Sequence, residues 1–187
     1  MLENYSPINE TQNYNNFSMR EKTLVPKINL RGNVNNKDFT SKVGKILGII
    51  LPVEVGGIAV KEKISIISTG PNEWLIISNN TIEENGNRFE LENILYESIS
   101  KNNLGAVTSV TDQFTIFSLK GSNIYEVLSK SSPFDFDKLL DNSSAQTLLN
   151  NIDITIVKKN NENMDLLVRR SFSEHLWDWI KDSANLS

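Results

Sequence analysis

Residues 164–180 read MDLLVRRSFSEHLWDWI, and this stretch predicts a strand that runs directly into a helix. The strand is a short apolar run that ends with two arginines, and Ser171 with Glu174 then matches the S-x-x-E pattern of a helix capping box. Successive helical residues lie about 100° apart, which collects one apolar arc: Phe172, Leu176, Trp179 and Ile180. We therefore expect the helix to dock through this arc, with Trp177 at its edge.

The preceding chain alternates between strand and helix patterns. Strands are predicted at residues 28–31, 63–68, 74–78, 106–110, 114–119, 146–149 and 152–158, and helices at 38–47, 89–100 and 122–130. The hairpin that ends at residue 78 carries a tight turn in which Pro71 presets φ and Asn72 tolerates the second central position. A polar loop is expected at 79–88. Together these patterns indicate an α+β fold with largely antiparallel sheets.

A possible internal repeat divides this pattern into halves. Leu30-Arg31-Gly32 precedes the first predicted helix, and Leu119-Lys120-Gly121 precedes the third. After each helix come a hairpin and an amphipathic helix, so both halves follow a split β-α-β-β-α order. Either duplication or chance recurrence of a common element order explains this. We predict pseudo-repeats at about 27–101 and 104–182 within a single domain, 27–183.

Residues 1–26 are polar, rich in asparagine and without periodicity. Such a segment buries too little apolar surface to offset the entropy lost on ordering. We expect a flexible N-terminal tail or a wrapping arm.

Composition excludes several classes of site. The 187 residues contain no cysteine and one histidine, His175, which leaves no thiolate zinc site, iron–sulfur cluster or histidine-rich metal site. A net charge of −4 argues against a dedicated nucleic-acid or anionic-membrane surface. The sequence shows no apolar run long enough to span a membrane and no signal-peptide pattern, so a cytoplasmic location is expected.

Few residues suggest chemistry. Arg169 and Arg170 stand at a helix start, where they favour either ion pairs with carboxylates or a bound anion; strand alternation points them to opposite faces. His175 lacks the neighbours of an acid–base catalyst, and Trp177 is either a fold edge or a partner contact. We predict no catalytic, cofactor-binding or metal-binding residue, and a partner interface that includes Arg169, Arg170, His175 and Trp177.

Several short motifs occur in a fixed order along the chain. They are Leu30-Arg31-Gly32, Gly70-Pro71-Asn72-Glu73-Trp74-Leu75, Val110-Thr111-Asp112, Pro133-Phe134-Asp135-Phe136, Ala145-Gln146-Thr147 and Val168-Arg169-Arg170-Ser171-Phe172-Ser173-Glu174 leading to Leu176-Trp177. This ordered set resembles the gamma subunit of heterotetrameric sarcosine oxidase. The similarity covers about residues 28–181 and leaves the N-terminal segment unexplained.

The resemblance implies an accessory subunit of an enzyme that oxidatively demethylates sarcosine. It implies alpha, beta and delta partner subunits, with FAD, covalent FMN, NAD, tetrahydrofolate and zinc all held outside this chain. It also implies a fold similar to the folate-binding domain of the glycine-cleavage aminomethyltransferase, which agrees with the split β-α-β-β-α pattern.

Other functions remain open at this stage. One is a stand-alone folate-binding aminomethyl or methyl transferase, or an iron–sulfur-assembly relative, although the second relies on a cysteine that this chain lacks. Another is the equivalent subunit of an enzyme that oxidises dimethylglycine or N-methylglutamate. An RNA-binding module is disfavoured because the paired aromatic motif of such sheets is absent.

Overall fold

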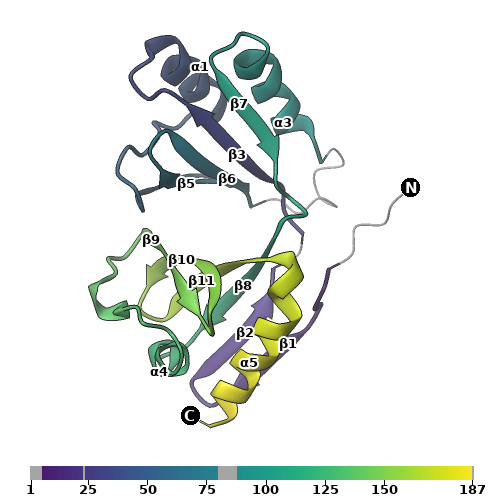
Figure 1. Ribbon diagram of the computed structural model, residues 1–187, viewed down its shortest axis with the longest axis vertical. Coiled ribbons are helices and arrows are strands. Elements are labelled where there is room, and N and C mark those ends of the chain that lie inside the picture. Colours follow the sequence, from purple (N-terminus) through teal and green to yellow (C-terminus); the bar gives the residue numbers. More distant parts are fainter. Residues whose placement is uncertain (1–5, 23, 80–87, 187) are drawn as a thin grey trace. The chain divides into compact units, whose positions relative to one another are not determined.

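A computed structural model describes residues 6–22, 24–79 and 88–186. Its chain divides into two compact units, one formed by residues 24–111 and the other by residues 1–23 together with 112–187 (Figure 1). The region that we predicted as a single domain, 27–183, is therefore split between two units, each described here by itself.

The unit 24–111 contains a five-stranded antiparallel sheet with helices on one face. The strand order is β4 (Ile58–Lys61), β5 (Ile64–Gly70), β6 (Glu73–Ser78), β3 (Lys27–Gly32) and β7 (Gly105–Ser109). The helices are α1 (Lys37–Leu47) and α3 (Glu90–Leu95), which continues as a π-helical turn, η1 (Tyr96–Ser100). Their apolar faces and one face of the sheet share a core that includes Leu30, Phe39, Val43, Trp74, Leu95 and Ile99.

Local sequence explains both ends of α1. The side chain of Asn36 accepts hydrogen bonds from the backbone N–H groups of Asp38 and Phe39, at 3.0 and 3.3 Å. At the other end Gly48 adopts a left-handed conformation with φ +66°, and its N–H donates to the carbonyl of Gly44. Helix α1 is thus fixed at both ends by its own residues.

The second unit contains a six-stranded antiparallel sheet. The strand order is β1 (Thr11–Tyr14), β2 (Phe17–Glu21), β8 (Phe114–Lys120), β11 (Asn163–Arg169), β10 (Ile152–Asn160) and β9 (Ser143–Leu149). The helical elements are α4 (Ile124–Ser129), α5 (Ser173–Asn185) and the short 3₁₀ turns η2 (Phe136–Lys138) and η3 (Arg170–Phe172). A second core, which includes Phe117, Leu128, Ile156, Leu166 and Trp177, lies between α4, α5 and the sheet.

The N-terminal segment is not a tail over most of its described length. Strand β2 pairs with β8, and the side chains of Phe17 and Met19 are buried in the core of the second unit. The prediction for residues 1–26 is therefore wrong for residues 11–21. Residues 1–5 and 23, and the predicted polar loop at 79–88 beyond Asn79 and before Arg88, lie outside the described residues.

The two units share one element order. It runs β3-α1-β4-β5-β6-α3 in the first and β8-α4-β9-β10-β11-α5 in the second, one strand more than the predicted β-α-β-β-α. The sheet orders β4-β5-β6-β3 and β9-β10-β11-β8 also correspond. The neighbour on the other side of β3 and β8 comes from a different place in the chain in each unit: β7 pairs with β3, whereas β2 pairs with β8. The strand predicted at 106–110 therefore completes the first sheet instead of opening the second repeat.

Helix α5 packs through a face shifted from the predicted one: Leu176 and Ile180 are buried as predicted, but Phe172 and Trp179 are not. Its buried residues are Ser173, Leu176, Trp177, Ile180, Ser183 and Ala184, whereas Phe172 is 46% exposed and Trp179 is only partly buried. The capping box is also absent: no side chain caps α5, and the hydroxyl of Ser173 donates to the carbonyl of Arg170 at 2.6 Å. The small residues Ser173, Ser183 and Ala184 also belong to the buried face, which a wheel of bulky residues omits, and the hydroxyl of Ser183 donates to the carbonyl of Val127 in α4 at 3.0 Å.

Candidate functional site

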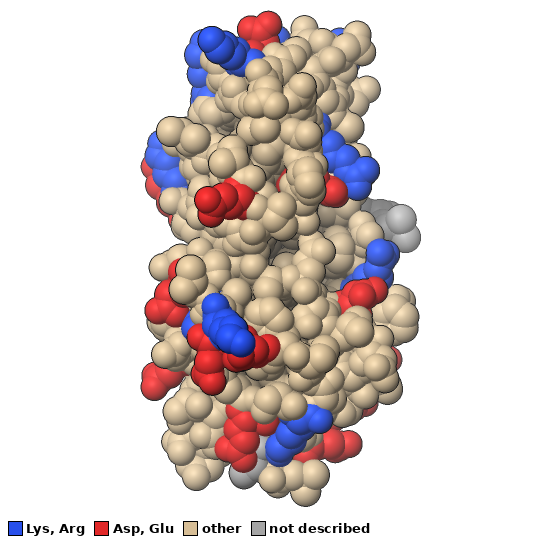
Figure 2. Space-filling model, turned by 60° about the vertical axis from the view of Figure 1, so that its left-hand side comes forward, with Lys and Arg blue, Asp and Glu red and all other residues tan. Residues whose placement is uncertain are grey.

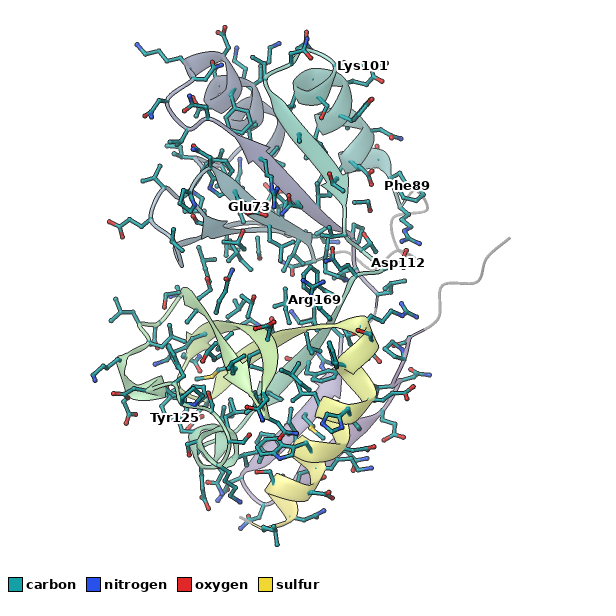
Figure 3. The ribbon with its side chains drawn as sticks, in the orientation of Figure 1. Glu73, Phe89, Lys101, Asp112, Tyr125 and Arg169 are labelled. Carbon is teal, nitrogen blue, oxygen red and sulfur yellow. The ribbon has the colours of Figure 1, made fainter. Side chains whose placement is uncertain are left out.

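The junction of β11 and α5 separates the two predicted arginines. The backbone N–H of Arg170 donates to the carbonyl of Gln113 at 2.9 Å, and its guanidinium lies 4.0 Å from the carboxylate of Asp112. Arg169 is exposed at the end of β11, opposite Phe114, and lines a hollow of about 430 Å³ (Figure 3). Arg170 lies beyond the strand, in the turn η3, so strand alternation does not apply to it; the two side chains have different surroundings and do not form one clamp.

The two aromatic candidates on α5 lie in different environments. His175 is exposed, and its Nε2 lies 3.1 Å from the amide nitrogen of Asn150. Trp177 is 2% exposed and packs edge-on against Phe117, with ring centroids 5.2 Å apart. A side chain so deeply buried stabilises the fold, so the prediction that Trp177 contacts a partner is wrong. Arg169, Arg170 and His175 remain predicted interface residues.

Two of the motifs meet across strands β3 and β6. The carboxylate of Glu73 accepts hydrogen bonds from the amide of Asn29 at 2.6 Å and the guanidinium of Arg31 at 2.9 Å (Figure 3). Partial burial raises the pKa of Glu73, but the hydrogen bonds from Asn29 and Arg31 and the charge of Arg31 outweigh it and lower that pKa below its ordinary value. The site therefore holds an ionised carboxylate that is already bound within the fold.

The turn between β5 and β6 is fixed as the sequence predicts. Asn72 has φ +59°, its carbonyl accepts from the N–H of Gly32 at 3.1 Å, and its side chain accepts from the N–H of Val34 at 2.8 Å. Trp74 is buried, and its indole N–H donates to the carbonyl of Pro52 at 2.7 Å. The motif thus shapes one turn and anchors the loop that follows α1.

Thr111 has a comparable role in the third motif. Its hydroxyl is buried and bonds to both backbone groups of Lys27, accepting from the N–H at 3.0 Å and donating to the carbonyl at 3.3 Å. This arrangement fixes the start of β3 and satisfies polar groups that would otherwise be buried without partners.

Sequence reasoning missed a buried charge cluster in the second unit. Asp165 lies in the middle of β11, and one carboxylate oxygen accepts from Lys22 at 2.7 Å and Lys159 at 2.9 Å. Burial raises the pKa of Asp165, yet the charges and hydrogen bonds of the two lysines lower it overall. An acidic residue inside the apolar run MDLLV was the available signal. Its lysine partners come from distant or adjacent strands, which the run alone does not reveal.

Several kinds of site find no support among the described residues. Within residues 6–22, 24–79 and 88–186, no group of three His, Cys, Asp or Glu residues is placed to hold a metal ion. No helix in these ranges is long and apolar enough to cross a membrane. Figure 2 shows a face on which acidic and basic side chains are interspersed and most residues are uncharged. That face carries no continuous basic surface of the kind that binds nucleic acid.

A profile of the "Sarcosine oxidase, gamma subunit family" matches residues 31–185. The chain belongs to this family. The match includes all the motifs that carried the resemblance, apart from Leu30 at the start of Leu30-Arg31-Gly32. It begins after the N-terminal strands β1 and β2. Among curated proteins, none matches significantly.

Solved structures support the same fold. Heterotetrameric sarcosine oxidase from Corynebacterium sp. U-96, in complex with pyrrole 2-carboxylate, is 23% identical with a TM-score of 0.79, over 90% of this chain and 84% of that chain. Aminomethyltransferase T of the glycine cleavage system from Bartonella henselae is 12% identical with a TM-score of 0.58; the match covers 87% of this chain and 44% of that one. The predicted likeness to the aminomethyltransferase fold is thus confirmed for this gamma subunit family member.

Proposed function

We propose that this chain is an accessory subunit without catalytic residues, in a sarcosine oxidase that also contains alpha, beta and delta subunits. Its membership of the gamma subunit family supports the subunit role. FAD, FMN, NAD, tetrahydrofolate and zinc belong, in this proposal, to the partner subunits. The cytoplasmic location remains a prediction.

The observation that carries the proposal is how the family motifs are used. Arg31 bonds to Glu73, the indole of Trp74 bonds to Pro52, and the hydroxyl of Thr111 bonds to Lys27. Each of these motif residues thus makes a contact that holds a strand, a turn or a loop of its own unit. Arg31 and Glu73 do border a hollow of about 700 Å³ beside the turn at Asn72, but the carboxylate there already accepts hydrogen bonds from Asn29 and Arg31 and is used within the fold.

A partner-binding role also requires an exposed surface, and the loop after α1 supplies a candidate. Ile50, Val53 and Val55 are 90%, 67% and 62% exposed, whereas Leu51 between them is buried. The bond from Trp74 to the carbonyl of Pro52 holds this loop against the first unit. Aliphatic side chains gathered in one exposed loop are typical of protein contact sites. We assign this loop, together with the exposed residues Arg169 and His175 of the other unit, to contacts with the other subunits.

Co-expression tests the proposal directly. Tagged chain, expressed with its alpha, beta and delta candidates, should purify as a complex that consumes oxygen when sarcosine is added. The chain purified alone should show neither flavin absorbance nor sarcosine-dependent oxygen consumption, and calorimetry should detect no tetrahydrofolate binding. Failure to co-purify would remove the subunit role, and flavin or tetrahydrofolate bound by the lone chain would contradict its accessory character.

A further inference from the structure

A hollow of about 570 Å³ lies in the unit 24–111, beside the end of α1, the β4–β5 hairpin and the start of α3. Its apolar lining is made by Ile46, Leu47, Ile64, Leu91 and Ile94, and lysines at positions 45, 61 and 63 stand around it. The volume falls within the range of about 300–1,000 Å³ that is usual for small-molecule sites. The lining therefore combines an apolar surface with several cations.

The lysines of this hollow have no ionic partner among the described residues. None of Lys45, Lys61 and Lys63 forms a side-chain hydrogen bond or ion pair with another described residue. Glu62 and Glu90 also contribute to the lining but do not pair with these lysines. An apolar hollow bordered by unpaired cations attracts an anion, although the whole chain carries a net charge of −4.

One of these cations lies against the end of α1. A side chain at position 48 would place its Cβ 2.6 Å from the Nζ of Lys61, so the ammonium lies in space beside Gly48 and would have to shift for a larger residue. Gly48 is also the left-handed residue that ends α1, where unpaired backbone carbonyls favour a positive charge. The glycine that terminates the helix therefore also makes room for Lys61.

We propose that this hollow binds an organic anion: an apolar body carrying a carboxylate, phosphate or sulfonate group. The apolar body would contact Ile46, Ile64 and Ile94, and the anionic group would be held by Lys61 and Lys63. An inorganic anion would leave the apolar lining in contact with water, and a neutral apolar molecule would not be attracted by the charge of the lysines. The lining includes none of the loop residues Ile50, Val53 and Val55, and the proposal does not depend on their assignment to subunit contact.

Two fluorescent probes with the same apolar body test the proposal on the 187-residue chain. 8-Anilinonaphthalene-1-sulfonate carries an anionic group, whereas N-phenyl-1-naphthylamine lacks it. We expect saturable binding of the sulfonate, weakened about fivefold by the double substitution Lys61→Gln/Lys63→Gln, since two exposed charge contacts are lost. Binding of the neutral probe should change less than about twofold.

Matched controls make the result specific. Lys37→Gln/Lys42→Gln removes the same charge from α1, away from the hollow, and should leave both probes unaffected. Ile94→Ser alters the half-exposed apolar lining and should weaken both probes. Circular dichroism confirms that each variant is folded. Equal loss of the sulfonate in the two lysine variants, or no saturable binding by the unsubstituted chain, would overturn the proposal.

Discussion

The sheets of the two units correspond, but the strand that pairs with β3 and the strand that pairs with β8 come from opposite sides of their units in sequence. In the unit 24–111, the strand beside β3 is β7, which follows all the other elements of that unit. In the second unit, the strand beside β8 is β2, which precedes all of them except β1 (Figure 1). A given place in a sheet can therefore be filled from either side in sequence, and the N-terminal segment is part of a core.

Helices α1 and α5 also differ in what stabilises them. Helix α1 carries a side-chain cap at Asn36 and a glycine at its end, whereas α5 has no side-chain cap at its start. Helix α5 is instead stabilised by tertiary contacts such as the packing of Trp177 on Phe117. Helix α1 is thus fixed at both ends by its own residues, whereas α5, like α3 of the first unit, starts without a side-chain cap and depends on packing.

The largest expected effect comes from removing the N-terminal contribution to the second core. Phe17→Ala/Met19→Ala should lower the free energy of unfolding by at least about 5 kcal/mol, because both side chains are buried against β8 and its core. Urea denaturation followed by circular dichroism measures this. Asn13→Ala, at an exposed position of β1, should have little effect. A double variant as stable as the original chain would show that the N-terminal strands do not contribute to folding.

Next in size is the contrast between two tryptophans on α5. Trp177→Ala should cost about 3–5 kcal/mol, whereas Trp179→Ala should cost less than half as much, because Trp179 is only partly buried. Trp177→Phe should be milder than Trp177→Ala, since the indole N–H has no hydrogen-bond partner to lose. Thermal and urea unfolding of the three variants give the ranking. The reverse order for Trp177 and Trp179 would restore the face predicted from the sequence.

These contrasts explain how far the sequence could predict the structure. Alternating apolar residues and the turn at Pro71-Asn72 predicted the hairpin of β5 and β6, because both signals are local. The strands at 11–21 were missed because only Phe17 and Met19 mark their buried face, within a polar surrounding. The face of α5 was only partly predicted, because the small buried residues Ser173, Ser183 and Ala184 do not register in a pattern of bulky apolar residues. Strand alternation does not decide how Arg169 and Arg170 are placed, because the strand ends at Arg169 and Arg170 begins the turn η3, and their partners depend on tertiary contacts.

The buried charge cluster at Asp165, in the second unit, is expected to have a smaller effect on stability that depends on pH. Because the pKa of Asp165 is lowered in the folded chain, its ionised form stabilises the fold above the unfolded-state pKa of about 3.9. That contribution is lost as pH falls through the lower, folded-state value. Asp165→Asn should therefore cost about 2 kcal/mol at pH 7, and the difference from the original chain should shrink in acid.

Urea unfolding at several pH values measures this dependence. Asp178→Asn, which removes an exposed partner of Lys181 at 3.8 Å, is the matched control and should change stability by less than about 0.5 kcal/mol. A difference for Asp165→Asn that stays constant from pH 7 to the acid range would contradict the lowered pKa.

The smallest effect on stability is expected in the loop that follows α1. The loop after α1 exposes Ile50, Val53 and Val55, whereas the corresponding connection after α4 buries Phe136 and Leu139 against its own core. The exposed side chains of the first loop therefore contribute little to folding, in keeping with the proposal that they contact another protein.

Val53→Glu/Val55→Glu should accordingly change the free energy of unfolding by less than about 0.5 kcal/mol, because both positions are solvent-exposed in the isolated chain. The same substitutions should reduce co-purification with the other sarcosine oxidase subunits at least about tenfold, since two unpaired carboxylates would be buried at an apolar contact. Glu62→Gln, just beyond β4, serves as an exposed control that should affect neither measurement. If the valine variant assembles normally while remaining folded, the partner surface of this subunit does not include the loop, and the exposed residues Arg169 and His175 become the next positions to substitute.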